Sequence, residues 1–169
     1  MSKSSVKLYP YHTLFEKSKE ILSVTDDIRA LSSLMCDEMY THGGVGLAAN
    51  QVGVTKRIIV VDVERLANKQ SLRVLINPVI VGCSGRLNST EACLSLPGIS
   101  LTVERFGQVT VRAFSLDEKE IEIEATGLLA ACLSHEIDHL DGITLMSKVS
   151  SLKRKMLIDI LNRAKRELV

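Results

Sequence analysis

The sequence predicts an α+β fold, in which small antiparallel sheets pack around a central helix and a further helix lies at the C-terminus. Residues 108–114 and 120–124 alternate apolar and polar side chains across a polar turn, which is typical of a β-hairpin. Residues 125–142 and 151–168 repeat apolar side chains at spacings of three and four, which is typical of helices. At 169 residues, with 46% hydrophobic residues, the chain is expected to form one catalytic domain over 1–169.

The N-terminal half begins with a predicted helix at 26–41, which must end before Gly43 and Gly44 because glycine disfavours helix. A β-branched run at 57–63 predicts a buried strand. Residues 72–81 predict a second strand, in which Pro78 indicates an edge position or a bulge. The apolar face of the first helix is expected to be Ile28, Leu31, Leu34, Met35 and Met39.

The two later helices differ in composition. The helix that starts at 125 is apolar on most sides, so we expect it to be largely buried. The last helix, from about 151, has an apolar stripe and many basic residues, which ordinarily form a solvated face. The stripe is Leu152, Met156, Leu157, Ile160, Leu161, Ala164 and Leu168. The basic residues are Lys148, Lys153, Arg154, Lys155, Arg163, Lys165 and Arg166.

Net charge, the N-terminal sequence and the cysteines give no indication of a DNA-binding, secreted, membrane-spanning or disulfide-bonded protein. The formal net charge of +1 gives no reason to expect DNA as a partner. The N-terminus has no apolar signal-peptide core and no segment is long enough to span a bilayer, so we expect a cytoplasmic protein. The four cysteines do not suggest disulfides. Cys36 and Cys132 are expected in the core and Cys83 in a turn, while Cys93 is the candidate thiolate.

Residues 134–139 contain the pattern His-Glu-x-x-His within a predicted helix. Positions four apart lie on one face of a helix, so His135 and His139 can bind one metal ion. Glu136 is then placed to handle the proton of a water that the metal activates. The alternative is a solvated helix face that carries two histidines and a carboxylate.

A catalytic site of this kind needs a third protein ligand and one open position. Cys132 lies one turn before His135, but three ligands along about 10 Å of one helix can hardly close around one ion. The third ligand should therefore come from another segment. The metzincin pattern fails, because its third histidine would fall at Leu145. A gluzincin would need Asp159 or Glu167, both of which lie in the basic last helix.

Three segments in order resemble the motifs of the peptide deformylase family: 44–51 (GVGLAANQ), 91–95 (EACLS) and 134–142 (SHEIDHLDG). The resemblance extends through RIIVVDV and LINP and so covers most of the chain. It implies that Cys93 is the third ligand, beside His135 and His139, of one divalent metal ion. Iron(II) is the ion that the resemblance favours, and zinc, nickel or cobalt would suit the same ligands.

The implied activity is removal of the N-formyl group from formyl-methionyl peptides, with release of formate. In this interpretation Glu136 is the acid and base, and Gln51 and the backbone N–H of Leu94 face the developing oxyanion. The peptide would enter as an added strand beside Val45 and Gly46. Its methionine would need an apolar pocket, which Leu128, Ala131 and Cys132 can line. Plain core packing is an equal alternative for these three residues.

The resemblance also suggests that the basic C-terminal helix contacts the ribosome, where formylated chains emerge. A bacterial-type cytoplasm is the expected compartment, and an organelle that starts translation with formyl-methionine remains open. Arg105 is expected to pair with Glu91 or Asp138 and so support the metal ligands, or to form only a surface ion pair.

Two residues depart from the usual motifs. Ala92 stands where glycine is common, so a positive φ there would be strained, and a negative φ would leave only an added methyl beside the substrate. Ser134 stands where glutamine is common, which can remove a hydrogen bond near the metal. The alternatives are therefore a deformylase-like hydrolase of shifted specificity, or a structural metal site or ribosome-binding relic. The structural site would want a fourth protein ligand.

Overall fold

The computed structural model describes residues 5–69 and 71–167, and in this part of the chain it forms three α-helices and seven β-strands. The α-helices are α1 (Asp26–Thr41), α2 (Gly127–Leu140) and α3 (Ser151–Glu167). The strands are β1 (Gly46–Ala48), β2 (Ile58–Val61), β3 (Arg73–Ser84), β4 (Leu87–Ala92), β5 (Ser100–Arg105), β6 (Gln108–Phe114) and β7 (Glu120–Thr126). Short 3₁₀ helices are η1 (His12–Phe15), η2 (Ala49–Val52), η3 (Glu64–Ala67) and η4 (Leu145–Lys148).

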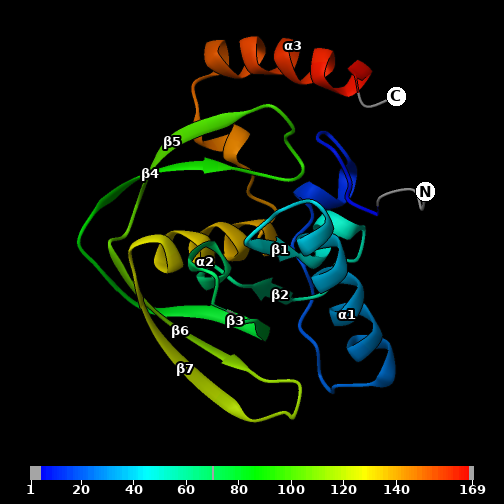
Figure 1. Cartoon of the computed structure of the whole chain (residues 1–169), viewed down its shortest axis with the longest axis vertical. Helices are drawn as coiled ribbons and strands as arrows, with labels where there is room; N and C mark the ends of the chain where they lie inside the picture. Colours follow the sequence, from blue (N-terminus) through cyan, green and yellow to red (C-terminus); the bar gives the residue numbers. More distant parts are fainter. Residues whose placement is uncertain (1–4, 70, 168–169) are drawn as a thin grey trace.

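The strands form two antiparallel sheets on either side of α2. The larger sheet has the order β1-β2-β3-β6-β7, and the smaller consists of β4 and β5. Figure 1 shows α2 between the two sheets, with α1 beside β1 and β2. The predicted α+β fold, with small antiparallel sheets around a central helix, is therefore confirmed.

Strand β2 is buried on both faces, which explains its continuous apolar sequence. Successive side chains of a strand point in opposite directions. Accordingly, Ile59 and Val61 belong to the core that packs around α2, whereas Ile58 and Val60 pack with α1. The HExxH helix is thus held against a rigid, fully covered strand.

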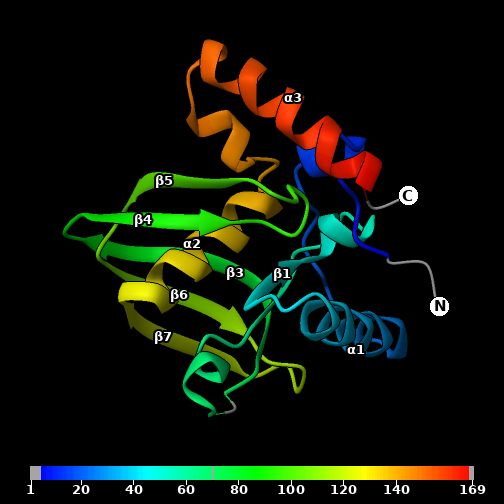
Figure 2. The same cartoon turned by 45° about the horizontal axis from the view of Figure 1, so that its top comes forward.

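A third core joins β5, η4 and α3. Leu101 and Val103 of β5 pack with Leu145 of η4 and with Leu157 and Leu161 of α3. Figure 2 shows α3 running along the β5 side of the molecule, away from β7. None of the helices described here is long and apolar enough to cross a membrane.

Most predicted elements are present with small shifts. α1 covers 26–41 as predicted, and β6 and β7 pair as the predicted hairpin from Gln108 opposite Thr126 to Phe114 opposite Glu120. The register of β3 against β6 shifts between Ile76 and Val79, so Pro78 marks a bulge. It does not mark an edge, because β3 is the middle strand of its sheet. α2 begins at Gly127, two residues later than predicted, because β7 continues to Thr126.

The apolar stripes of α1 and α3 are buried only in part. In α3 the side chains of Leu157 and Leu161 are buried and Ala164 is half-buried. Ile158 of α3 also packs against this core, and Nε of Arg154 donates to the carbonyl of Met146 at 2.8 Å. Leu168 lies outside the described residues. Leu34 on α1 is also exposed, since the helix contacts the sheet through its neighbouring face. The members of the predicted α3 stripe that face solvent are Leu152, Met156 and Ile160.

Two cysteine predictions and two secondary-structure elements also need correction. Cys83 lies in the exposed end of β3 rather than in a turn, and Cys36 is only partly buried. Strands β1 and the β4–β5 pair were not predicted from the sequence. Strand β4 reads LNSTEA, in which Thr90 is the only β-branched residue and no residue is aromatic, so its composition does not signal a strand.

Candidate metal site and cleft

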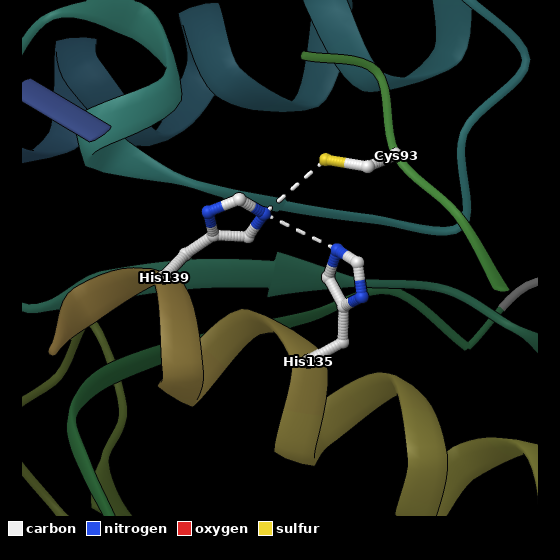
Figure 3. A group of neighbouring side chains, drawn as sticks. All are labelled: Cys93, His135 and His139. Carbon is white, nitrogen blue, oxygen red and sulfur yellow. Dashed lines mark hydrogen bonds between the residues drawn. The ribbon is translucent and has the colours of Figure 1, made fainter. Parts of the chain in front are cut away.

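Three predicted ligand side chains converge on one point from two elements. α2 carries His135 and His139 one turn apart, and Cys93 follows the end of β4. The two Nε2 atoms are 3.2 Å apart, and Sγ of Cys93 is 3.2 Å from Nε2 of His139 (Figure 3). All three residues are buried, and among the described residues no fourth Cys, His or acidic side chain joins this group.

These positions fit a divalent metal ion. Metal–nitrogen bonds of about 2.0–2.1 Å at tetrahedral angles place ligand nitrogens about 3.3 Å apart, close to the observed separation. Nδ1 of His135 lies 2.9 Å from Oε2 of Glu91, so the ring donates its Nδ1 proton there and leaves the Nε2 lone pair facing the group. Burial lowers the pKa of His139 well below its usual value and favours the neutral, metal-binding imidazole. One thiolate and two imidazoles suit a borderline-soft ion.

An ion-pair network supports this arrangement from behind. Arg105, whose side chain is 5% exposed, donates through Nε and Nη2 to the two carboxylate oxygens of Glu91, each at 2.8 Å. It also donates to Asp138, which in turn pairs with Lys148. Although burial raises the pKa of Glu91, the bonds from Arg105 and His135 outweigh this and hold it at about 2. Arg105 therefore pairs with both predicted partners.

Glu136 lies beside the metal group with its carboxylate directed to the cleft. Its side chain is buried, and within the described structure Oε2 has no hydrogen-bond partner. Burial raises the pKa of Glu136 to about 7. A carboxyl group with a pKa close to neutrality can both accept and return a proton.

Gln51 is held in one orientation at the other side of the group. Its Oε1 accepts the backbone N–H of Ala48 at 2.9 Å, so the amide nitrogen must point the other way. Nε2 donates to Oγ of Ser95 at 3.1 Å and faces Sγ of Cys93 at 3.4 Å. The N–H donors of Gln51 are thus aimed at the metal group.

A cleft of about 1360 Å³ leads to these residues. Leu128 is 52% exposed, while Ala131 and Cys132 are buried beside the ligands. A side chain at Gly46 would collide with Glu136 and Cys132, so this position has room only for glycine. The predicted substrate and oxyanion residues all line this cleft: Val45, Gly46, Gln51, Leu94, Leu128 and Ala131.

The two departures from the motifs have different surroundings. Ala92 ends β4 opposite Ser100 and is not among the described residues with positive φ, so it carries no strain. Ala92 is exposed and lines the cleft. Its effect is therefore that of an added methyl group in the cleft, as expected for a residue without positive φ. Ser134 donates to the carbonyl of Ala130 at 2.8 Å, within its own helix.

Two buried residues of the site were missed by sequence reasoning. Ser95 bonds the Gln51 amide, and Asn50 donates through its side chain to the carbonyl of His139 at the end of α2. Asn50 is fully buried, and Oγ1 of Thr13 donates to its main-chain carbonyl at 2.8 Å. Both contacts join segments that are remote in sequence, so local patterns do not predict them. The only indication in the sequence that Asn50 and Ser95 belong to the site was their position inside the motifs.

Comparisons with known proteins find similar sequences and similar overall structures. A model of the family described as polypeptide deformylase matches residues 3–155. A peptide deformylase of Thermodesulfovibrio yellowstonii is 50% identical over 151 residues, which is 89% of this chain and 92% of that protein. The crystal structure of a peptide deformylase from Legionella pneumophila has a TM-score of 0.92 at 39% identity, covering 96% of this chain and 95% of that one. The peptide deformylase of Ehrlichia chaffeensis in complex with actinonin has a TM-score of 0.91 at 36% identity, with 98% and 99% covered.

Proposed function

This chain belongs to the polypeptide deformylase family, and we propose how its residues remove the N-formyl group from nascent peptides. The overall reaction is hydrolysis of a formamide: water adds to the formyl carbon, the C–N bond breaks, and formate and a free amine leave. The observation that carries the assignment of residues is the convergence of Cys93, His135 and His139 beside the buried carboxylate of Glu136.

We propose that Cys93, His135 and His139 hold one divalent metal ion, and that this ion is iron(II). When bound, such an ion supplies Lewis acidity, which polarises the formyl oxygen and acidifies water. Zinc, nickel or cobalt would suit the same three donors. Metal analysis of protein purified without oxygen tests the identity of the ion. Iron in excess of zinc would support the proposal, and zinc alone under those conditions would contradict it.

Glu136 is proposed to move the proton. Its carboxylate accepts the proton of the attacking water and passes it to the nitrogen of the departing amine. Its buried position at the cleft beside the three proposed ligands supports this role. An exchange with bulk water is restricted, because the carboxylate is almost completely buried.

Gln51 and the backbone N–H of Leu94 are proposed to stabilise the negative charge that develops on the formyl oxygen. The bond from Ala48 to Oε1 of Gln51 supports this role, because it commits the amide nitrogen to the reacting side. A fixed donor needs no reorganisation during the reaction. Loss of one such donor typically costs about 3–4 kcal/mol of transition-state stabilisation.

The peptide is proposed to bind as an extended strand between the two sheets. β1 is the edge strand of the larger sheet, and β4 is one of the two strands of the smaller, and residues of both line the cleft. Main-chain groups near Val45 and Gly46 would pair with the peptide. The methionine side chain would lie against Leu128 and Ala131, since an apolar side chain gains free energy when it leaves water.

A ribosomal contact and a bacterial-type cytoplasm complete the proposal. Translation starts with formyl-methionine in that compartment, and the relatives compared above include bacterial enzymes. Basic residues of α3 are exposed and support contact with ribosomal RNA, among them Lys153, Lys155 and Arg163. Co-sedimentation with ribosomes should weaken steeply as salt is raised. Sedimentation that is unaffected by charge reversal at these three residues would contradict the contact.

A hydrolase of shifted specificity is the second candidate, and the exposed methyl of Ala92 in the cleft favours it. It predicts that formyl-peptides other than formyl-methionyl ones are better substrates. Formate release from formyl-Met-Ala-Ser and from formyl-Leu-Ala-Ser at equal concentrations separates the two candidates.

The decisive experiment measures formate release from formyl-Met-Ala-Ser together with bound metal. Glu136→Gln should lower kcat by at least about 100-fold while the metal content stays unchanged. The matched control is Glu124→Gln, which alters an exposed carboxylate on β7. Metal-loaded wild-type protein that releases no formate would overturn the proposed function.

A further inference from the structure

Arg65 contacts the backbone of the cleft edge, residues 44–46. It belongs to η3, in the segment between β2 and β3, outside the three motifs. Its Nη1 donates to the carbonyl of Gly44 at 2.7 Å. Its guanidinium carbon lies 5.1 Å from the centre of the Tyr40 ring, a distance at which a cation is attracted to the ring face.

A buried carboxylate holds this arrangement together. Asp62 is fully buried, and its Oδ2 accepts the hydroxyl of Tyr40 at 2.7 Å. Its Oδ1 accepts the backbone N–H groups of Arg65 at 3.3 Å and Ser71 at 3.2 Å. The backbone N–H of Asp62 donates to the carbonyl of Val45 at 2.8 Å. Consecutive carbonyls of the cleft edge, those of Gly44 and Val45, are therefore held by neighbouring residues of one cluster.

The cleft edge has little freedom to move towards the site. A Cβ at Gly44 would come within 3.0 Å of Cδ1 of Leu94, and one at Gly46 within 2.5 Å of Oε1 of Glu136. The edge is therefore in close contact with the site on one side and bonded to the Arg65 cluster on the other. Strand pairing depends on the direction of main-chain N–H and C=O groups, so the position of this edge governs how well a peptide strand fits.

We propose that Arg65 is a positioning residue for the peptide strand, which orients the cleft edge and so sets affinity for the residues that follow the formyl-methionine. This inference rests on the proposed function, because it takes the cleft edge as the strand to which the peptide pairs. Arg65 bonds to Gly44 and Asp62, whereas the atoms nearest to a Cβ at Gly46 belong to Glu136 and Cys132. We therefore expect Arg65 to affect binding of the chain rather than bond cleavage.

The test compares substrates of different length in wild-type protein and in Arg65→Met. For formyl-Met-Ala-Ser, KM should rise about tenfold, because the peptide must then order the released edge as it binds, while kcat stays within about twofold. For formyl-Met amide, which lacks the following residues, KM should change less than about twofold. The split between KM and kcat, and its dependence on length, would not arise from general destabilisation.

Two further variants keep the comparison interpretable. Arg73→Met removes a guanidinium that pairs with Glu64 of the same segment, and it should leave both KM values unchanged. Arg65→Lys keeps the charge but not the planar group, so KM for the tripeptide should rise severalfold less than in Arg65→Met. Should Arg65→Met fail to fold, Arg65→Lys decides the question alone through the same comparison.

Each outcome bears on the inference. An active wild-type enzyme with unchanged KM values in both Arg65 variants would overturn it and leave the proposed function standing. An equal rise in KM for both substrates would also overturn it, because the effect would then not depend on peptide length. Wild-type protein that carries metal but releases no formate would overturn the proposed function and this inference with it.

Discussion

Gly46 lies directly against the carboxylate of Glu136. A Cβ at Gly46 would be 2.5 Å from Oε1 of Glu136 and 2.8 Å from Sγ of Cys132. Gly46 is not among the described residues with positive φ, so its requirement for glycine is one of space rather than of backbone conformation. The proposed peptide-binding edge and the proposed proton carrier are thus in direct contact.

We expect Gly46→Ala to lower kcat/KM about 100-fold, because the methyl must displace the Glu136 carboxylate by a substantial fraction of an ångström. Bound metal should remain, since the atoms nearest to that Cβ belong to Glu136 and Cys132, neither of which is a proposed ligand. The measurement is formate release beside metal content. Gly107→Ala is the control, as a Cβ there meets nothing nearer than 3.6 Å. Equal losses in the two variants would refute the steric explanation.

Arg105 should matter for both stability and metal affinity. Arg105→Met leaves the buried carboxylate of Glu91 without its bidentate partner, which should cost about 3–5 kcal/mol in the free energy of unfolding. It should also weaken metal binding about 10–100-fold, because Glu91 orients His135. Urea unfolding and competition with a chelator measure the two effects. Arg112→Met, which breaks pairs made by a half-exposed side chain, should cost under about 1 kcal/mol.

Ala92→Gly tests whether this departure from the common motif restricts the enzyme. Since the φ of Ala92 is not positive, glycine relieves no strain and should destabilise the strand by about 0.5–1 kcal/mol. We expect kcat for formyl-Met-Ala-Ser to stay within about twofold. Parallel assays with formyl-Met-Phe-Ser test whether removal of the Ala92 methyl lets the cleft accept a bulkier residue after methionine. A large gain with the bulkier peptide alone would identify the Ala92 methyl as a determinant of specificity.

Tyr40 should give a distinct alkaline signature. Burial and the hydrogen bond to Asp62 raise the pKa of Tyr40 from 10.0 to about 12. The neutral phenol therefore favours the folded state fully below pH 10, and this contribution is lost as pH rises through about 12. Phenolate absorbance during alkaline titration should lose its latest step in Tyr40→Phe but keep it in Tyr11→Phe. An unchanged titration in Tyr40→Phe would contradict the assignment.

Much of the fold follows from local patterns in the sequence. The two histidines of HExxH are four residues apart, and this spacing puts His135 and His139 on one face of a helix, whatever surrounds them. The β-branched run of β2 and the alternation of β6 and β7 indicate their strands because burial on one or both faces selects such residues. Strand β4 was missed because its one buried position carries a polar residue, Ser89, so the strand shows no alternation of buried apolar and exposed polar residues.

The sequence by itself determined the helices, the strands β2, β3, β6 and β7, and the spacing of His135 and His139, because these are properties of a few consecutive residues. Only the tertiary structure decided that Arg105 bonds both Glu91 and Asp138, that Ser95 orients Gln51, and that Arg65 holds Gly44. These contacts join segments far apart in the chain, and they arise from the packing of α2 between two sheets. A local pattern reports burial along one element but not which remote side chain will fill the space beside it.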